Sequence, residues 1–280
     1  MSSTREHRLD VDGPVDLVVR NPRGVVTVTA VTATPAAAGD AEPVTVSVTG
    51  PAPDTVDVRS EDGRVEVAAP TGRSAEGHYH LTIRVPAGSR LTARLGSSEL
   101  SAVGPLATAT VQGASGDVTV EDLAGASRVE TGSGDVRLSR CADVTVQSGS
   151  GDVELRRVGG AAQVSTGSGD VTVDACTHEL VVKTGSGDLH VRSLQGALSF
   201  STASGDLTVE RAEHGSVSAR SASGDVHVGV PAGLPTWTDV GSVSGEVASE
   251  LEAVGEPAPG QDHLLVRATT VSGDVRLSRR

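Results

Sequence analysis

Residues 168–185 read Ser168-Gly-Asp-Val-Thr-Val-Asp-Ala-Cys-Thr-His-Glu-Leu-Val-Val-Lys-Thr-Gly185, and versions of this unit recur along most of the chain. Nine copies of Ser-Gly-Asp, once as Ser-Gly-Glu, begin at Ser115, Ser133, Ser150, Ser168, Ser186, Ser204, Ser223, Ser244 and Ser272. The spacings are 18, 17, 18, 18, 18, 19, 21 and 28 residues. A nearly fixed period of this length, rich in Val and Thr and punctuated by Gly, predicts a coil that stacks on copies of itself.

The apolar residues of the unit predict two strands per coil. If the Ser is position one, apolar residues fall at positions four and six, at nine, and at thirteen and fifteen, with Thr at seventeen. Alternation of this kind indicates strands with one buried face. We therefore predict an all-β fold, a parallel β-solenoid of about 18 residues per coil. One-residue changes in unit length should fall in the turn between the strands, because a shifted strand would turn its core face outward.

Position four is held by Val118, Val136, Val153, Val171, Leu189, Leu207 and Val226, and position six by Val120, Leu138, Leu155, Val173, Val191, Val209 and Val228. Both columns should be buried, together with the residue at position nine. A hydroxyl before each Gly-Ser-Gly corner should form an internal ladder, rung to rung or to backbone carbonyls, because a buried hydroxyl needs a partner. The corner glycines should supply positive φ values.

The first third of the chain carries the pattern in a weaker form. Three segments resemble the repeat: Asp16 to Val28, Asp54 to Val67, and Leu91 to Leu100. Pro- and Gly-rich inserts lie between them, at Thr34 to Pro43 and Pro70 to Gly77. We predict an irregular N-terminal β region over residues 1–96 that acts as a cap, and a regular solenoid over residues 97–280, continuous with it as one elongated domain. The acidic excursion Glu252 to Asp262 should be mobile.

Composition restricts the partners. The chain has 280 residues, a net charge of −13 and three aromatic residues, Tyr79, Phe200 and Trp237. The negative charge argues against nucleic acid and anionic membrane surfaces, which attract clustered cations. The N-terminus has no apolar signal region and no segment is long enough to span a bilayer, so we expect a cytoplasmic protein without membrane insertion. Cys141 and Cys176 fall two coils apart, roughly 9.6 Å, so both should be free thiols.

Three features together resemble a known family: the recurrent Thr-Gly-Ser-Gly-Asp-Val-x-Val, the pair Val85-Pro-Ala-Gly88 and Val230-Pro-Ala-Gly233, and the closing Thr270-Val-Ser-Gly-Asp-Val-Arg-Leu277. They are similar to the bacterial "putative adhesin" family, a β-strand-repeat domain of unknown function. The resemblance covers nearly the whole chain from about residue 8. It implies a β-solenoid and, in some members, a surface-associated binding role. It supplies no catalytic residues.

A column of carboxylates is the first candidate site. Its members are Asp117, Asp135, Asp152, Asp170, Asp188, Asp206, Asp225 and Asp274, with Glu246 in the same position. Neighbouring charges at strand spacing would repel by about 0.9 kcal/mol in water. We expect each carboxylate to accept hydrogen bonds from nearby backbone N–H groups. The alternative is a linear site for Ca²⁺ or a cationic partner, although one column offers few of the six to eight oxygens that Ca²⁺ prefers.

Other candidates are isolated. His78 and His80 should share an outward strand face, where they could form a metal pair without a third ligand nearby in sequence. His190 and His227 should lie two coils apart, too far to chelate one ion. The irregular stretch from Pro231 to Thr270 contains Trp237, Asp239, Glu246, Glu250 and Asp262, which an enzyme could gather around a groove. Trp237 with Asp239 forms a possible ligand patch, or Trp237 caps the end of the solenoid.

These observations predict a non-enzymatic binding or scaffold module, similar to an adhesin, with a protein or glycan partner and no cofactor. The first alternative is a self-polymerising structural rod, because exposed strand edges favour end-to-end self-association. The second alternative is a carbohydrate-binding or carbohydrate-active β-helix.

Overall fold

The computed structural model describes residues 2–32, 43–71, 77–251 and 263–280. The backbone contacts divide the chain into two compact units, residues 1–142 and 143–280. The predicted segment Glu252 to Asp262 and most of the insert Thr34 to Pro43 lie outside the described residues, as do residues 72–76 of the insert Pro70 to Gly77. The boundary between residues 96 and 97 stays a prediction, because the contacts separate the chain within the repeats instead.

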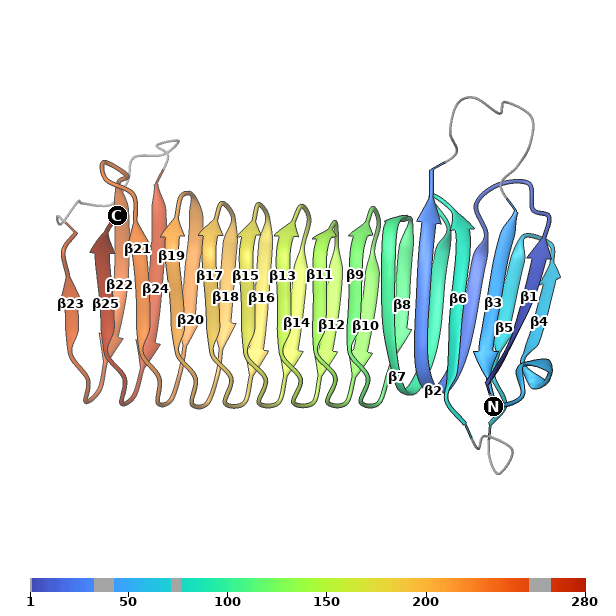
Figure 1. Cartoon of the computed structure of the whole chain (residues 1–280). Coiled ribbons are helices and arrows are strands. Elements are labelled where there is room, and N and C mark those ends of the chain that lie inside the picture. The colour runs from blue at the N-terminus through green and yellow to red at the C-terminus, as the bar shows by residue number, and fades with distance from the viewer. Residues whose placement is uncertain (1, 33–42, 72–76, 252–262) are drawn as a thin grey trace. The chain divides into compact units, whose positions relative to one another are not determined.

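Residues 143–280 form a two-stranded β-solenoid, in which each coil adds one parallel strand to each of two sheets (Figure 1). The first sheet contains β13 (Val153–Val158), β15 (Val171–Cys176), β17 (Leu189–Leu194), β19 (Leu207–Ala212), β21 (Val226–Val230), β25 (Val275–Arg279) and β23 (Val247–Ser249). The second sheet contains β12 (Val144–Ser148), β14 (Ala162–Thr166), β16 (Glu179–Thr184), β18 (Ala197–Ser201), β20 (Gly215–Arg220), β24 (Leu264–Thr270) and β22 (Thr236–Ser242).

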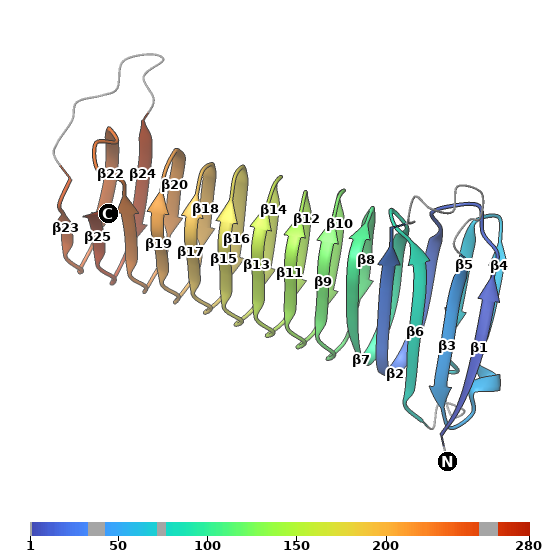
Figure 2. The same cartoon turned by 45° about the horizontal axis from the view of Figure 1, so that its top comes forward.

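The last coils do not follow the order of the sequence. β24 pairs with β20 on one side and with β22 on the other, and β25 lies in the same way between β21 and β23. The last coil in sequence, β24 with β25, therefore lies between the coil of β20 and β21 and the coil of β22 and β23. β23 is the outermost labelled strand at this end in both views (Figures 1 and 2). The spacings of 21 and 28 residues indicated irregular coils but did not reveal this exchange.

Residues 1–142 contain an antiparallel margin followed by parallel coils. The strands are β1 (Ser3–Leu9), β2 (Asp16–Val31), β3 (Val44–Gly50), β4 (Asp57–Glu61), β5 (Arg64–Ala68), β6 (Tyr79–Pro86), β7 (Arg90–Leu106), β8 (Thr108–Gln112), β9 (Val118–Leu123), β10 (Ser127–Thr131) and β11 (Val136–Cys141), with a 3₁₀ turn η1 (Pro53–Thr55). β1 pairs antiparallel with β3, and β3 with β6. The long strands β2 and β7 pair in parallel along both arms of one coil.

Two of the three weak repeats are coils, and the third is not. The segments Asp16 to Val28 and Leu91 to Leu100 pair in register, with Leu17 opposite Leu91 and Val26 opposite Leu100. The prediction for Asp54 to Val67 was wrong, because β4 and β5 form an antiparallel hairpin. Its turn uses Asp62 at φ 47° and Gly63 at φ 75°, the left-handed conformations that a tight hairpin turn requires.

The predicted core columns are buried throughout. Every residue at position four is at most 2% exposed and every residue at position six at most 1%. Val158, Cys176, Leu194 and Ala212 fill the corner at position nine, also at 1% or less. The extra residue of the 19-residue unit falls between Ala212 and Ser216, at the connection from β19 to β20, and Gly215 at the start of β20 adopts φ 87°. The two strands thus keep their core register, as predicted.

The role predicted for the corner glycines was wrong. The glycines of Ser-Gly-Asp do not have positive φ; the described positive-φ glycines lie elsewhere. Their requirement is steric instead. A Cβ added to Gly187 would lie 2.0 Å from the carbonyl oxygen of Gly169 in the neighbouring coil, and the same contact at Gly169 would be 2.1 Å. These distances are below any real Cβ contact, so only Gly lets the corners stack at strand spacing.

The register predicts a clear difference between two adjacent substitutions. Val171→Asp places an unpaired carboxylate in the core and should destabilise the protein by about 3–5 kcal/mol, whereas Thr172→Asp lies on the outward face and should change stability by about 0.5 kcal/mol or less. Urea denaturation followed by circular dichroism measures both. Equal tolerance of the two variants would contradict the register.

The stacking of the corners yields a second prediction. Gly187→Ala should lower stability by about 1–3 kcal/mol, because a neighbouring coil must move to admit the methyl group. Gly241→Ala is the matched control, since a Cβ at Gly241 meets no atom within 4 Å. Thermal melts of the two variants should separate clearly, and a normal melt for Gly187→Ala would refute the steric role of this glycine.

Candidate functional site

The carboxylate column is a ladder of hydrogen bonds. In residues 143–280, the backbone N–H of each acidic residue of the column from Asp170 onward donates to the Oδ1 of its neighbour in the adjacent coil, at 2.8–2.9 Å. The spatial order of this ladder is Asp152, Asp170, Asp188, Asp206, Asp225, Asp274 and Glu246. Asp135 donates in the same way to Asp117 in the other unit. The predicted bonds to backbone N–H groups are therefore observed.

The ladder explains how like charges tolerate close stacking. A hydrogen bond from a backbone N–H to an ionised carboxylate is charge-assisted and offsets the repulsion between neighbours. Among the described residues, no group of three or more His, Cys, Asp or Glu side chains has the arrangement of a metal site. Whether the column also attracts cations stays a prediction.

The hydroxyl column stabilises the same corners, but differently from the prediction. Thr166 Oγ1 accepts the N–H of Gly169 at 3.1 Å, and Thr184 Oγ1 accepts that of Gly187 at 2.9 Å. Each hydroxyl thus caps its own corner three residues later, as Ser and Thr commonly do in turns. A bond to the next rung also occurs, from Ser242 Oγ to the carbonyl of Gly273 at 2.8 Å. The prediction allowed hydroxyls to pair rung to rung or with backbone carbonyls; the bonds to carbonyls of the neighbouring coil are observed at Ser242 and Thr270, and the caps within each corner were not predicted.

The outward face of the first sheet in residues 143–280 carries paired charges. Arg192 donates to Asp174 of the adjacent coil at 2.8 Å, and Arg156 donates to Glu154 at 3.0 Å. His190 lies 2.8 Å from Glu210. His227 lies two coils from His190, as predicted, and its pKa is lowered, mainly by burial and then by Arg280 and Arg276. Charges on this charged face thus largely satisfy one another.

The outward face of the second sheet is different, and it is the candidate site. We call a set of outward residues on β14, β16, β18 and β20 the open polar face: Gln163, Ser165, Val181, Lys183, Ser199, Ser201 and Ser218. Each is at least partly exposed. Their hydroxyl, amide and ammonium groups have no hydrogen-bond partner among the described residues. Glu179 on β16 and Arg220 on β20 are also outward and exposed, and they place two charges beside this face. Sequence analysis missed this face, although the outward positions of the second strand are visibly poor in charge compared with those of the first.

The predicted ligand patch lies on the same sheet. Trp237 and Asp239 occupy outward positions of β22, beside Leu265 and Arg267 of β24. Asp239 accepts from Arg267 Nε at 3.0 Å, and Trp237 is half-buried. Asp239 and Arg267 continue the column of outward residues that contains Ser199 and Ser218, because Ser199 pairs with Ser218 and Ser218 with Arg267 on neighbouring strands. Trp237 lies on the outermost coil, as the capping interpretation expected, but it points outward and does not cover the core.

The acidic residues considered for catalysis are not gathered in one place. Asp239 belongs to β22 in the second sheet, whereas Glu246 precedes β23 in the first sheet. The Glu250 carboxylate accepts the backbone N–H of Arg279 at 3.2 Å. Asp262 lies outside the described residues.

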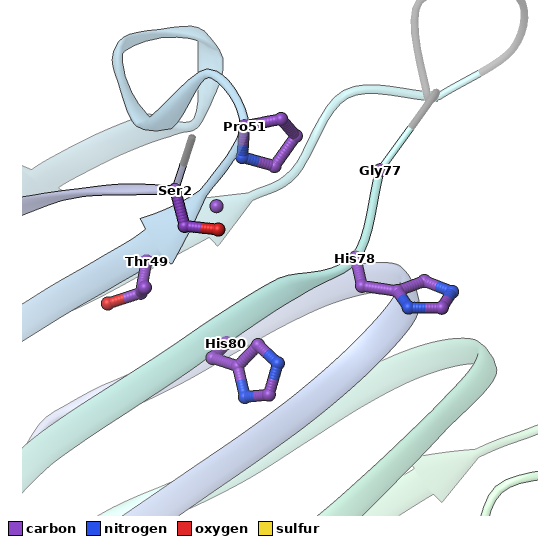
Figure 3. A pocket seen from close by; sticks show the side chains of 7 residues that line it. Ser2, Thr49, Pro51, Gly77, His78 and His80 are labelled. Atoms are coloured by element: carbon purple, nitrogen blue, oxygen red, sulfur yellow. The ribbon is translucent and has the colours of Figure 1, made fainter.

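His78 and His80 line an open pocket. The pocket has a volume of about 570 Å³ and lies at one end of β3 and β6 (Figure 3). Its lining residues are Ser2, Thr49, Gly50, Pro51, Gly77, His78 and His80. His80 is outward and exposed, and Tyr79 between them is 2% exposed. No third side chain of a metal site accompanies them within the described part of the chain.

Both cysteines are buried free thiols, as predicted. Cys176 has a raised pKa, mainly because burial disfavours the thiolate, so this side chain acts as a small core residue.

A family model, Toastrack DUF4097, matches residues 27–178 and 128–278. The chain belongs to this family. The Toastrack fold is a β-solenoid, as the sequence predicted. No curated protein matches the chain, and no described helix has the length and apolar character of a membrane span. The cytoplasmic location stays a prediction.

Solved structures similar to this Toastrack chain have low identity. A "putative adhesin" from Bacteroides fragilis NCTC 9343 is 12% identical over 99% of this chain and 97% of that chain, with a TM-score of 0.35. A "putative lipid binding protein" from Parabacteroides distasonis ATCC 8503 is 13% identical over 99% and 96%, with a TM-score of 0.36. A "putative adhesin" from Parabacteroides merdae ATCC 43184 is 12% identical over 99% and 95%, with a TM-score of 0.36.

The acceptor role of the carboxylate ladder can be tested at Asp188, whose Oδ1 accepts the N–H of Asp206 at 2.8 Å. Asp188→Ala removes the acceptor and should cost about 1–2 kcal/mol. Asp188→Asn keeps an oxygen at the same place and should cost much less. Urea denaturation with and without Ca²⁺ measures both. A cation site would give a different result: Asp188→Asn would lower the free energy of unfolding as much as Asp188→Ala does, but only in the presence of Ca²⁺.

Proposed function

We propose that this Toastrack protein is a non-enzymatic, adhesin-like binding module, and that an extended glycan binds along its open polar face. The observation that supports this most directly is the availability of hydrogen-bonding groups on that face. Gln163, Ser199 and Ser201 present amide and hydroxyl groups that make no bonds within the described structure. A ligand rich in hydroxyl groups can pair with such side chains in both donor and acceptor roles.

The repeat gives the face a regular geometry. Gln163, Val181, Ser199 and Ser218 occupy the same register position in four successive strands. Such positions are separated by about 4.8 Å, the spacing of hydrogen-bonded strands. Most of the side chains are short Ser residues, and the strands lie side by side in register, so an extended polymer could contact several rungs at once. Many weak contacts along one chain then add to a useful affinity.

Trp237 supplies the apolar part of the binding surface. It lies outward on β22 beside Leu265, in the same sheet as the open polar face. Sugar rings have apolar faces that stack on an indole, and the indole N–H can donate to a hydroxyl. The ion pair between Arg267 and Asp239 lies next to it and offers further polar contacts. Trp237 should therefore anchor one end of the ligand.

The charged face is the less suitable surface. Arg156, Arg192 and His190 already have acidic partners at 2.8–3.0 Å. A ligand on this face would have to replace these pairs and would gain little net free energy. This difference between the two faces makes one of them a matched control for the other.

Glycan-array binding of the purified chain tests the proposal. Ser199→Arg places a long charged side chain in the centre of the open polar face, and Trp237→Ala removes the stacking surface. Each should weaken binding by about tenfold or more, which corresponds to about 1.4 kcal/mol. Thr172→Arg, on the charged face, should leave binding unchanged.

Two results would contradict the proposal. One is the absence of binding to every glycan on the array. The other is equal loss of binding for Thr172→Arg and Ser199→Arg when circular dichroism shows that both are folded. Turnover of a bound glycan would instead support the carbohydrate-active alternative.

A further inference from the structure

The outermost coil of residues 143–280 leaves two strands without an outer partner. β22 pairs only with β24, and β23 only with β25, among the described residues. We call the outer margins of these two strands the terminal edge. An unpaired strand edge presents a row of N–H and C=O groups that favours pairing with another strand.

The hydrogen bonds show which amides of the terminal edge are available. The N–H of Leu264 donates to the carbonyl of Pro235, and the N–H of Val243 donates to the carbonyl of Thr270. Because successive residues of a strand alternate their bonding side, the odd-numbered residues of β22 bond to β24. Thr238 and Val240 therefore direct their N–H and C=O groups away from β24. The N–H of Glu250 donates to the carbonyl of Leu277, so the even-numbered residues of β23 bond to β25. By the same reasoning, the backbone N–H and C=O groups of Val247 point away from β25.

Exposed apolar side chains concentrate on the last two coils, close to this edge. Of the four exposed large hydrophobic residues that the structure describes, Val243, Val247 and Val271 lie on the last two coils, at 80%, 43% and 51% exposure. The last residue before each Ser-Gly corner also becomes larger toward the edge. In spatial order the column is Gly149, Gly167, Gly185, Ala203, Ala222, Val271 and Val243. Exposed apolar surface at a strand edge is characteristic of an association surface.

The inward-facing side chains of the outermost coil remain partly exposed to solvent, because no further coil of the described residues covers them. The inward residues of β22 include Thr238 and Val240, both at least partly exposed, where the corresponding residues of β24, Val266 and Ala268, are fully buried. A further layer of strands would remove these side chains from water.

The outer strands of residues 1–142 have the opposite character. β1 carries Arg5, Glu6 and Arg8, and β4 carries Asp57, Arg59 and Glu61. Two exposed ion pairs, Arg5 with Asp54 and Arg59 with Asp57, lie at this margin. Charged, antiparallel edge strands are a common protection against edge-to-edge association. The charged margin, whose ion pairs would have to be broken, is therefore a poor partner for the terminal edge.

We propose that two copies of this chain associate through their terminal edges into a closed, two-fold dimer. β22 has one charged residue, Asp239, which is already paired with Arg267, so two copies of β22 meet without strong repulsion despite the net charge of −13. The exposed Glu246 and Glu250 on either side of β23 oppose the contact at low salt, where charges are least screened. A two-fold contact is isologous and uses the same surface on both copies, so it ends at two subunits. The protected margin of β1 and β4 prevents growth by head-to-tail addition. This dimer does not depend on the glycan proposed above.

Analytical ultracentrifugation of the full chain over a range of concentrations tests the dimer. The wild type should show a reversible monomer–dimer equilibrium. Val247→Lys should raise the dimer Kd by about tenfold or more, because it places a charge in the contact, and Thr238→Pro should do so by removing an edge N–H. Val103→Lys is the matched control, since Val103 is 47% exposed but lies on β7; it should not change the Kd.

Three results would overturn the dimer. They are a monomer at every concentration, equal Kd values for Val247→Lys and Val103→Lys, and assemblies that grow beyond two subunits as the concentration rises. Thermal melts of each variant identify any that fail to fold, and the two edge substitutions act through different chemistry, so one of them suffices for the comparison.

Discussion

The close contact between successive Ser-Gly-Asp corners is the constraint on which the solenoid depends. The glycine of one corner lies so near the carbonyl of the preceding corner that a single methyl group would not fit. The same approach brings each Asp carboxylate within hydrogen-bonding distance of the next backbone N–H. Strand spacing, glycine and the acidic ladder are therefore three aspects of one geometry. The columns of buried Val and Leu stack in the same register as the corners, so a change that separates the corners would also disturb the packing of the core.

The difference between the two sheets follows from how the repeat divides its outward positions. The first strand has alternating acidic and basic residues that pair across coils, as Asp174 does with Arg192. From β14 to β20 the outward positions of the second strand are mostly Ser, Gln and Val, and the ion pair that crosses coils on this sheet, Arg267 with Asp239, lies at its outer end. On a face whose charged side chains already pair with one another, a ligand must break those pairs to bind. On a face whose hydroxyl and amide groups have no protein partner, a ligand can form hydrogen bonds without breaking any within the protein. The two sheets therefore differ in how many outward polar groups already have partners, and this difference is the basis of the proposed glycan site.

Sequence periodicity was enough for the coil, its two strands and its buried columns, because a column such as Val171, Leu189 and Leu207 is a direct record of the register. It was not enough for the corner glycines, since a positive φ and a steric contact both require Gly. It also misjudged Asp54 to Val67, whose alternation fits an antiparallel hairpin as well as a coil. The open polar face was missed for another reason. Short polar residues form no motif, and only the structure shows that their partners are absent among the described residues.

The exchanged order of the last coils is the feature that periodicity is least able to reveal. Every coil presents the same backbone groups to its neighbour, so β20 could accept either β22 or β24 with equal numbers of bonds. The choice is consistent with the side chains: β24 brings Leu264, Val266 and Ala268 to the core, whereas β22 brings Thr236, Thr238 and Val240. The more apolar coil is buried between two neighbours, and the more polar one is left outermost. The terminal edge is therefore a consequence of core composition, and the same ranking of coils that completes the fold leaves an edge able to meet its own copy.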